Sequence, residues 1–363
     1  MSQAARSHVS KQIHAEMTRQ GIILPELARN SGINQSIIGE YLDAEREIKF
    51  PELRPIFESL GQDLIQALSA KPIIAYVSWR KTPTHDRELA ASLAKSFLRV
   101  EDLLPKPKQP HLAIRLDDSE NDPGMLLSEV KRATESAQKI LGHRRVEDAY
   151  RQWGVPVIGL HLGNDALDGM CLSASSGKTL VVVNADQPLT RLRFTLLHEL
   201  WHVLFDQKKD IPPDHLGQDF YRDKIPRDAV PEYRANKWAQ LWLVSWDVAS
   251  KAYDSFQKGS DLAWAQQVLR DAGASSFVLA NAIFDVARFK QTKLTYASIR
   301  DRLQQDQGLQ GNFGLPDVRR FVDEETQSIG RLIESHEAEF GESVLSGLRA
   351  TLQLRNQDAI DAV

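Results

Sequence analysis

Two histidines four positions apart flank a glutamate in residues 193–206, RFTLLHELWHVLFD. The three residues are His198, Glu199 and His202. On an α-helix, positions i and i+4 lie one turn apart on the same face, so both imidazoles can reach one metal ion. Zinc lowers the pKa of the water it binds towards ~7, and a neighbouring carboxylate can take the proton of that water. The spacing therefore predicts a Zn²⁺ site that performs hydrolysis, with Glu199 as the general base.

The polar residues of this segment share one face of the predicted helix. At ~100° per residue, an arc of about 100° contains Thr195, His198, Glu199, His202 and Asp206. The opposite side is apolar and includes Trp201. Ionisable groups beside so apolar a surface are costly unless they are paired or coordinated. Metal binding is therefore a better explanation of the pattern than two ordinary surface or core histidines.

A catalytic zinc site has three protein ligands and one open position, so a third ligand is needed. Glu232 lies about 30 residues after His202 in a second predicted helix, PEYRANKWAQLWLVSW, which is the spacing of gluzincin sites. Asp206 continues the face of the first helix and is better suited to hold a ligating imidazole. His215, in a proline-rich loop, is a third candidate. The spacing favours Glu232, and His215 and Tyr221 are candidates for stabilising an oxyanion because they lie between the two helices.

These paired motifs resemble the ImmA/IrrE family of metallo-endopeptidases. The family pattern is F-T-x-x-H-E-x-x-H on one helix and E-x-x-A-N-x-x-A on the next. The matching residues here are Phe194, Thr195, His198, Glu199, His202, Glu232, Ala235, Asn236 and Ala239. The resemblance covers roughly residues 130–250 and implies zinc bound by His198, His202 and Glu232. It also implies a supporting role beside the ligands for Asn236.

The resemblance implies a class of substrate, and this sequence differs from the family pattern at two points. Family members typically cleave a transcriptional repressor and thereby release genes of a mobile element, a defence system or a stress response. The family usually has glycine where this chain has Trp201, which predicts a different packing neighbour for the first helix. The Met-Pro that often ends the second motif is absent from LWLVSWD. A protein substrate is therefore the expected partner, and its sequence is open.

The N-terminal part reads as a run of short helices. In residues 24–42 apolar positions recur on both sides of Ser31-Gly32, which predicts two short helices around a tight turn. This outline resembles the helix-turn-helix domains of phage-repressor-like, XRE-type regulators over about 55 residues. The candidates for base and phosphate contacts are Asn34, Gln35, Ser36 and Arg29. DNA is therefore a second expected partner.

A second function follows from this module: a DNA-binding regulator in which the zinc site is structural or silent. Against it, residues 1–70 hold seven basic and nine acidic side chains, a charge of about −2. An acidic module lacks the phosphate attraction that supplies most non-specific affinity for DNA. Protein docking or homodimerisation is the competing use of the same module. The charge balance favours the protease over the regulator.

Composition is ordinary for a globular protein of two or three domains: the 363 residues are 42% hydrophobic and 26% charged, with a net charge of −4. No apolar run approaches the roughly 20 residues of a membrane span, so no membrane partner is expected. The start lacks a secretory stretch and the one cysteine, Cys171, cannot form an internal disulfide, which predicts a cytoplasmic location.

The expected fold is α+β and mostly helical. We expect a helix-turn-helix domain in residues 1–69, a zincin-like metallopeptidase domain with a small sheet and the HExxH helix in residues 70–254, and a helical domain of unknown role in residues 255–363. Strands are predicted at 73–79, 155–162 and 179–185, with a further strand between the last two. Helices are predicted at 87–104, 125–141, 146–153, 262–272, 276–289, 317–333 and 343–354.

Overall fold

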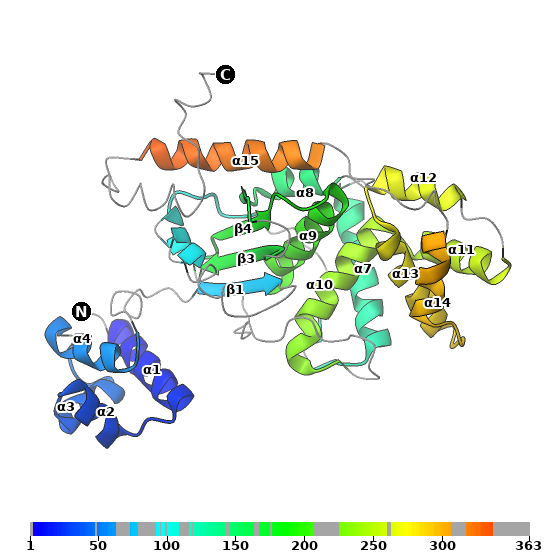
Figure 1. Cartoon of the computed structure of the whole chain (residues 1–363). Helices are drawn as coiled ribbons and strands as arrows, with labels where there is room; N and C mark the ends of the chain where they lie inside the picture. Colours follow the sequence, from blue (N-terminus) through cyan, green and yellow to red (C-terminus); the bar gives the residue numbers. More distant parts are fainter. Residues whose placement is uncertain are drawn as a thin grey trace. The chain divides into compact units, whose positions relative to one another are not determined.

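The computed structural model of the chain divides into two compact units, residues 1–72 and residues 73–363 (Figure 1). It describes residues 3–47, 49–62, 73–78, 92–94, 96–98, 100–108, 116–117, 119–141, 145–162, 167–174, 176–206, 225–259, 263–305 and 317–336. The expected class is confirmed: the fold is α+β and mostly helical. Among the helices in these ranges, none combines the length and the apolar character needed to cross a bilayer.

The described part of the N-terminal unit has four helices: α1 (Gln3–Gln20), α2 (Leu24–Ser31), α3 (Gln35–Leu42) and α4 (Phe50–Ser59). Their shared core contains Val9, Ile13, Leu27, Ile38, Tyr41, Leu53, Ile56, Phe57 and Leu60. Gly32 ends α2 with a φ of 68°, a left-handed conformation that glycine adopts without strain. Asn34 then caps α3, because its side chain accepts a hydrogen bond from the Ser36 N–H at 2.9 Å. The two short helices around a glycine turn are confirmed, and their assignment as a DNA-binding module stays a prediction.

A four-stranded sheet lies at the centre of the larger unit. Its strands are β1 (Ile73–Ser78), β2 (Val157–Leu160), β3 (Gly169–Ala174) and β4 (Thr179–Asn184), in the order β1-β3-β4-β2. β3 is antiparallel to both β1 and β4, whereas β2 runs parallel to β4. β3 therefore has hydrogen-bonded neighbours on both sides and its position is fixed by two ladders.

The two faces of this sheet are covered by different layers. On one face Cys171, Val181 and Val183 share a core with α7 (Pro123–Leu141), α8 (Val146–Trp153), α9 (Leu189–Trp201) and α10 (Val230–Leu243). On the other face Met170 and Val182 pack with side chains of residues 93–104 and of α15 (Asp317–Glu334). The period-two alternation of β3 and β4 produces these two cores. Residues 343–354, predicted to be helical, lie outside the described residues.

Helix α15 closes the β2 edge of the sheet. The Gly159 N–H of β2 donates a hydrogen bond to the Thr326 hydroxyl at 2.8 Å. A Cβ at Gly159 would overlap Cγ1 of Val322 on the same helix, so the glycine permits this close approach. An edge strand is thus covered by a helix and shielded from pairing with other chains.

Four further helices continue the larger unit: α11 (Trp246–Gln257), α12 (Ala263–Ala272), α13 (Ser276–Phe289) and α14 (Tyr296–Gln305). Figure 1 shows α11, α13 and α14 grouped beside α10. The largely buried Lys237 of α10 donates to Asp285 of α13 at 2.6 Å, and Gln240 donates to the same carboxylate. Residues 73–363 thus form one compact unit, in which apolar packing and this ion pair join α10 to α13. The predicted domain boundary at residue 254 stays a prediction.

The Lys237–Asp285 pair gives a first prediction. Asp285→Ala leaves a largely buried ammonium without its carboxylate, so we expect the free energy of unfolding to fall by about 3–5 kcal/mol in urea titrations. Asp254→Ala is the matched control, because Asp254 pairs with Lys290 at 2.9 Å on the exposed surface and should matter by less than about 1 kcal/mol. Equal effects of the two substitutions would contradict the role given to the buried pair.

Candidate metal centre

Two helices position the residues predicted to bind metal. α9 carries His198 in its last turn, and α10 begins at Val230 with Pro231 and Glu232 in its first turn. Proline is compatible with a first turn, whose N–H groups have no helical partner. The rings of Trp201 and Trp238 pack between the two helices with centroids 5.5 Å apart. Trp201 is fully buried, so the residue that departs from the family pattern packs α9 against α10.

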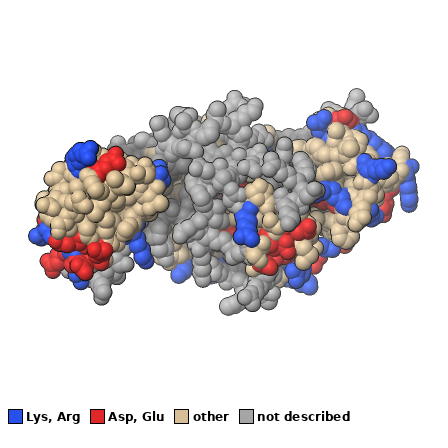
Figure 2. All heavy atoms as spheres, turned by 90° about the horizontal axis from the view of Figure 1, so that it is seen from below, with Lys and Arg blue, Asp and Glu red and all other residues tan. Residues whose placement is uncertain are grey.

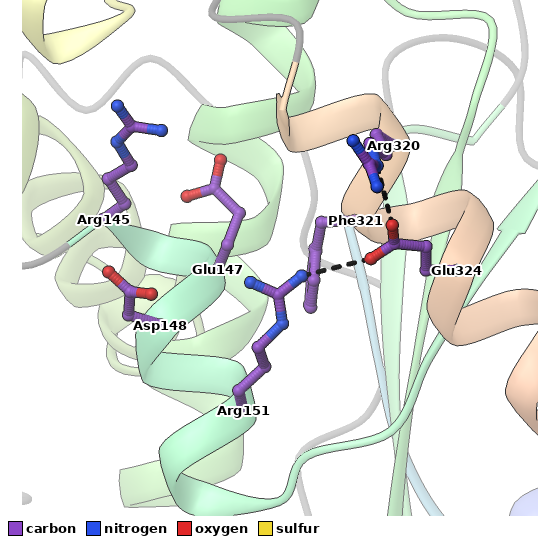
Figure 3. Close-up of a pocket in the computed structure, with 7 residues that line it drawn as sticks. All are labelled: Arg145, Glu147, Asp148, Arg151, Arg320, Phe321 and Glu324. Atoms are coloured by element: carbon purple, nitrogen blue, oxygen red, sulfur yellow. Dashed lines mark hydrogen bonds and ion pairs between the residues drawn. The ribbon is translucent and has the colours of Figure 1, made fainter.

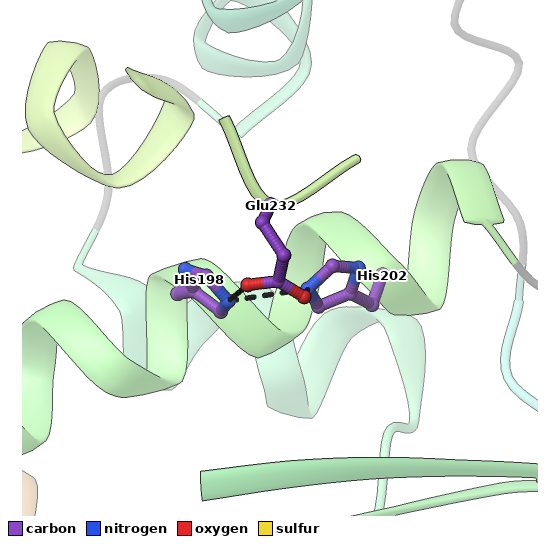
Figure 4. A group of neighbouring side chains, drawn as sticks. All are labelled: His198, His202 and Glu232. Carbon is purple, nitrogen blue, oxygen red and sulfur yellow. Dashed lines mark hydrogen bonds and ion pairs between the residues drawn. The ribbon is translucent and has the colours of Figure 1, made fainter. Parts of the chain in front are cut away.

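The two imidazoles and the Glu232 carboxylate form one compact cluster (Figure 4). Nε2 of His198 lies 3.1 Å from Oε2 of Glu232, and Nε2 of His202 lies 3.3 Å from Oε1. The two Nε2 atoms are 3.1 Å apart. Three donor atoms from three side chains thus converge on a single point, as a metal site requires.

The helix that carries the histidines changes its winding within the site. His202–Asp206 form a π-helical turn directly after α9, whereas a regular α-helix was expected through Asp206. Single π-turns inside helices occur frequently at functional sites. Asp206 Oδ2 lies 3.0 Å from Nδ1 of His202 in this turn. The local widening therefore accompanies a carboxylate–imidazole contact between residues 202 and 206.

The outer nitrogen of each imidazole has its own partner. Nδ1 of His202 donates to the Asp206 carboxylate, and Nδ1 of His198 lies 3.2 Å from the Asn236 side-chain oxygen. A hydrogen bond at Nδ1 sets the tautomer that leaves Nε2 free to bind a metal. Both supporting residues named from the sequence, Asp206 and Asn236, are therefore beside the histidines.

The opposite charges within the cluster stabilise one another. Burial lowers the pKa of His202, but the Glu232 and Asp206 carboxylates outweigh burial and raise it to about 10. Burial raises the pKa of Glu232, yet the two imidazoles hold it well below its usual range. A histidinium and a carboxylate are therefore the stable forms of the metal-free cluster at neutral pH.

Glu199 lies beside the cluster and is left without a partner. Its side chain is fully buried, and neither carboxylate oxygen has a hydrogen bond. Burial raises its pKa well above the ordinary value, the Glu232 and Asp168 carboxylates raise it further, and His202 opposes them. An unpaired buried carboxyl with a raised pKa is a candidate for a functional group.

The structure decides which sequence candidates lie together. His198, His202 and Glu232 form the cluster, and Glu199, Asp206 and Asn236 surround it. Asp206 contacts the Nδ1 side of His202 and is therefore placed as a support. His215 and Tyr221 lie outside the described residues, so their predicted roles stay predictions.

The comparison with known families agrees with this geometry. Residues 151–266 match the family model Peptidase_M78, the IrrE N-terminal-like domain. The match supports a metallopeptidase-like domain in this segment. No curated protein and no solved structure matches the chain. The matched segment includes the whole cluster and α9 and α10, while β1, α7 and α15 of the same compact unit lie beyond it.

A polar network next to Glu199 was not predicted from the sequence. The Thr195 hydroxyl donates to the Gln187 side-chain oxygen at 3.1 Å, and the Gln187 amide donates to the Asp168 carboxylate at 2.6 Å. Arg191 of α9 forms an ion pair with Asp168. These contacts tie the beginning of β3 to α9. The only signal in the sequence is the glycine after Asp168, since an isolated glycine at a strand often marks a close backbone approach.

A second group of charged residues lines a cavity of about 240 Å³ between α8 and α15 (Figure 3). Its walls are formed by Arg145, Glu147, Asp148, Arg151, Arg320, Phe321 and Glu324. Glu324 pairs with both Arg151 and Arg320, at 3.3 and 2.7 Å. Three arginines face three acidic residues, so the cavity carries no excess charge that would select an anion or a cation.

The predicted DNA contacts of the N-terminal unit are placed unequally. Gln35, Ser36 and Arg29 are exposed, whereas the Asn34 side chain caps its own helix. Arg46 pairs with Glu40 at 2.5 Å and with Glu52 at 2.7 Å, so this cation is neutralised within the unit. On the face that Figure 2 shows, acidic side chains form a patch on this unit. The exposed polar residues remain candidates for DNA, and DNA binding stays a prediction.

Metal uptake should release a proton from His202. With a pKa of about 10, the metal-free imidazole is protonated at pH 7, and a metal binds only the neutral form. We expect the apparent Zn²⁺ affinity to rise by about tenfold for each unit of pH between about pH 6 and 8. Calorimetry in buffers of different ionisation enthalpy measures the released protons.

Two variants serve as the test and the control for this measurement of Zn²⁺ binding. His202→Ala should abolish tight Zn²⁺ binding, whereas His161→Ala should leave it unchanged, because the exposed His161 pairs with Asp186 outside the cluster. A Zn²⁺ affinity that does not depend on pH, or that survives His202→Ala, would exclude this assignment.

Proposed function

We propose that this protein is a zinc-dependent endopeptidase of ImmA/IrrE type. His198, His202 and Glu232 bind the metal, and Glu199 is the general base. The observation that carries the proposal is the buried cluster of two imidazoles and one carboxylate beside a second, unpartnered carboxylate. Its support comes from the geometry of α9 and α10 and from the family match over residues 151–266.

The donor set suits a catalytic zinc ion. Two imidazole nitrogens and one carboxylate oxygen lie within 4.8 Å of one another. In the described ranges this group has three members, and catalytic zinc sites have three protein ligands whereas structural sites have four. Imidazole and carboxylate without thiolate also fit zinc better than copper(I) or an iron–sulfur cluster. The residues present therefore favour a catalytic centre over a structural one.

The residues around the centre divide the work of peptide hydrolysis. A bound zinc ion supplies a Lewis acid that polarises the scissile carbonyl and acidifies water. Glu199 takes a proton from the attacking water and returns one to the leaving amine, for which its buried position and raised pKa are suited. Asp206 and Asn236 hold the imidazoles in the tautomer that presents Nε2.

The proposed substrate is a transcriptional repressor or a similar regulatory protein. Its cleavage would release genes of a mobile element, a defence system or a stress response. The support is the resemblance of the paired helix motifs to the ImmA/IrrE family, together with a compact N-terminal unit that can act as a docking module. The N-terminal helices would then recruit the substrate or its operator DNA.

Glu199→Gln tests the proposed chemistry. The amide keeps the shape of the side chain but cannot accept the proton, so we expect one Zn²⁺ per chain and a loss of cleavage of about 10²–10⁴-fold. Products of neighbouring genes, co-expressed with each variant, are analysed by mass spectrometry for fragments. Glu135→Gln, an exposed residue of α7, is the control and should cleave as the unmodified protein does. Fragments that persist at the same level in Glu199→Gln would sink the proposal.

A further inference from the structure

Gly169, the first residue of β3, faces Glu199 with no side chain between them. A Cβ built on Gly169 would lie 2.5 Å from Cγ2 of Thr195, 3.0 Å from Oε1 of Glu199 and 3.2 Å from its Cγ. Contacts between a Cβ and heavy atoms closer than about 3 Å force something to move, because they lie inside van der Waals separation. A side chain at position 169 would therefore overlap the Thr195 methyl group and press against the Glu199 side chain one turn further along α9.

The backbone at Gly169 has little freedom to give way. β3 lies inside the sheet, where Gly169 pairs with Ser78 of β1 and with Val183 of β4. An inner strand held by two ladders cannot shift away from α9 without breaking hydrogen bonds on one side. The next residue of β3 on the same face is Cys171, which is fully buried in the core shared with α9. A larger residue at 169 must therefore displace the side chains of α9.

The helix side of the contact is also fixed. Thr195 donates its hydroxyl to Gln187, whose amide donates to Asp168, the residue directly before Gly169. Rotation of the Thr195 methyl group away from a new Cβ would break this hydrogen bond. Arg191 pairs with Asp168 and holds the same end of β3 against α9. With the Thr195 side chain held, the 2.5 Å contact is relieved by a shift of α9, which carries Glu199 with it, and Glu199 has no hydrogen bond of its own to keep it in place.

We propose that Gly169 is a positioning residue for the general base, an inference that rests on the proposed role of Glu199. Asp168 clamps β3 to α9, and the missing side chain of Gly169 leaves the space in which the Glu199 carboxylate is held. The metal ligands are not among the nearest atoms to that space. A side chain at position 169 should therefore leave metal binding intact and impair proton transfer by Glu199.

Gly169→Ala measures this separation on the Zn²⁺-loaded protein. We expect one Zn²⁺ per chain and an unchanged KM, with kcat lowered by about 100-fold, since a displaced base loses most of its contribution. Gly159→Ala is the matched control: Gly159 lies in β2 of the same sheet, and its Cβ would overlap Val322 of α15 and no residue of the cluster. It should lower the melting temperature and leave the kcat of the folded protein within about twofold, a range set by the absence of any contact with the base.

A rescue variant and a double-mutant cycle of melting temperatures complete the test. Thr195→Ser removes the methyl group that the new Cβ meets and keeps the hydroxyl for Gln187, so Gly169→Ala/Thr195→Ser should regain at least about tenfold in kcat. Without any substrate, the drop in melting temperature caused by Gly169→Ala should shrink in a Glu199→Ala background, because one of the two side chains that the new Cβ meets is gone. If Gly169→Ala fails to fold alone, the double variant carries the kinetic comparison.

The outcomes distinguish the two proposals. If the unmodified protein shows no cleavage that depends on Glu199, the proposed endopeptidase function is overturned. The double-mutant cycle of melting temperatures still tests the contact between positions 169 and 199. An unchanged kcat in Gly169→Ala overturns the positioning role. So does loss of Zn²⁺ in that variant, or a melting-temperature drop of the same size in the Glu199→Ala background.

Discussion

Burial of four ionisable side chains between α9 and α10 is the constraint on which the larger unit depends. His198, His202, Glu199 and Glu232 sit where water cannot stabilise their charges, so each charge must be balanced by another or left able to change its protonation. Two imidazoles against one carboxylate give a balanced cluster, and the second carboxylate remains. Burial and the neighbouring Glu232 and Asp168 carboxylates raise the pKa of this second carboxylate, Glu199.

Such a cluster functions only if the helices that carry it cannot slide. Buried ion pairs hold them from several sides: Arg193 of α9 pairs with Glu147 of α8 at 2.6 Å, and Arg234 of α10 pairs with Glu129 of α7 at 2.6 Å. Lys237 adds its link to α13. A buried ion pair contributes little net stability compared with apolar packing, but it fixes register, because a shift by one residue leaves charges unpaired. Their concentration on α9 and α10 is consistent with that use.

Local patterns made much of this predictable. The spacing of His198 and His202, the apolar face that contains Trp201 and the proline before Glu232 depend on neighbours within a few turns, and helices follow from them. The π-turn at His202–Asp206 was missed because a helical wheel assumes one winding. The pairing of β1 with β3 joins residues about a hundred positions apart, and no local signal records it. Gly169 had a signal as a strand glycine, but only the register shows that it faces Glu199.

The C-terminal helices show how a segment without a chemical motif can hold in place the helices that carry the buried cluster. Asp285 looks like a surface residue in sequence, yet it neutralises Lys237 one position after Asn236, the partner of a predicted metal ligand. Gly273, in the turn between α12 and α13, leaves room for the buried guanidinium of Arg193. Arg319 of α15 donates to the backbone of Gln187 at 2.8 Å, two hydrogen bonds away from Gly169's neighbour Asp168. These contacts supply counter-charges and spacing for the helices that carry the buried cluster. Residues with such roles follow the geometry of their partners and form no motif of their own.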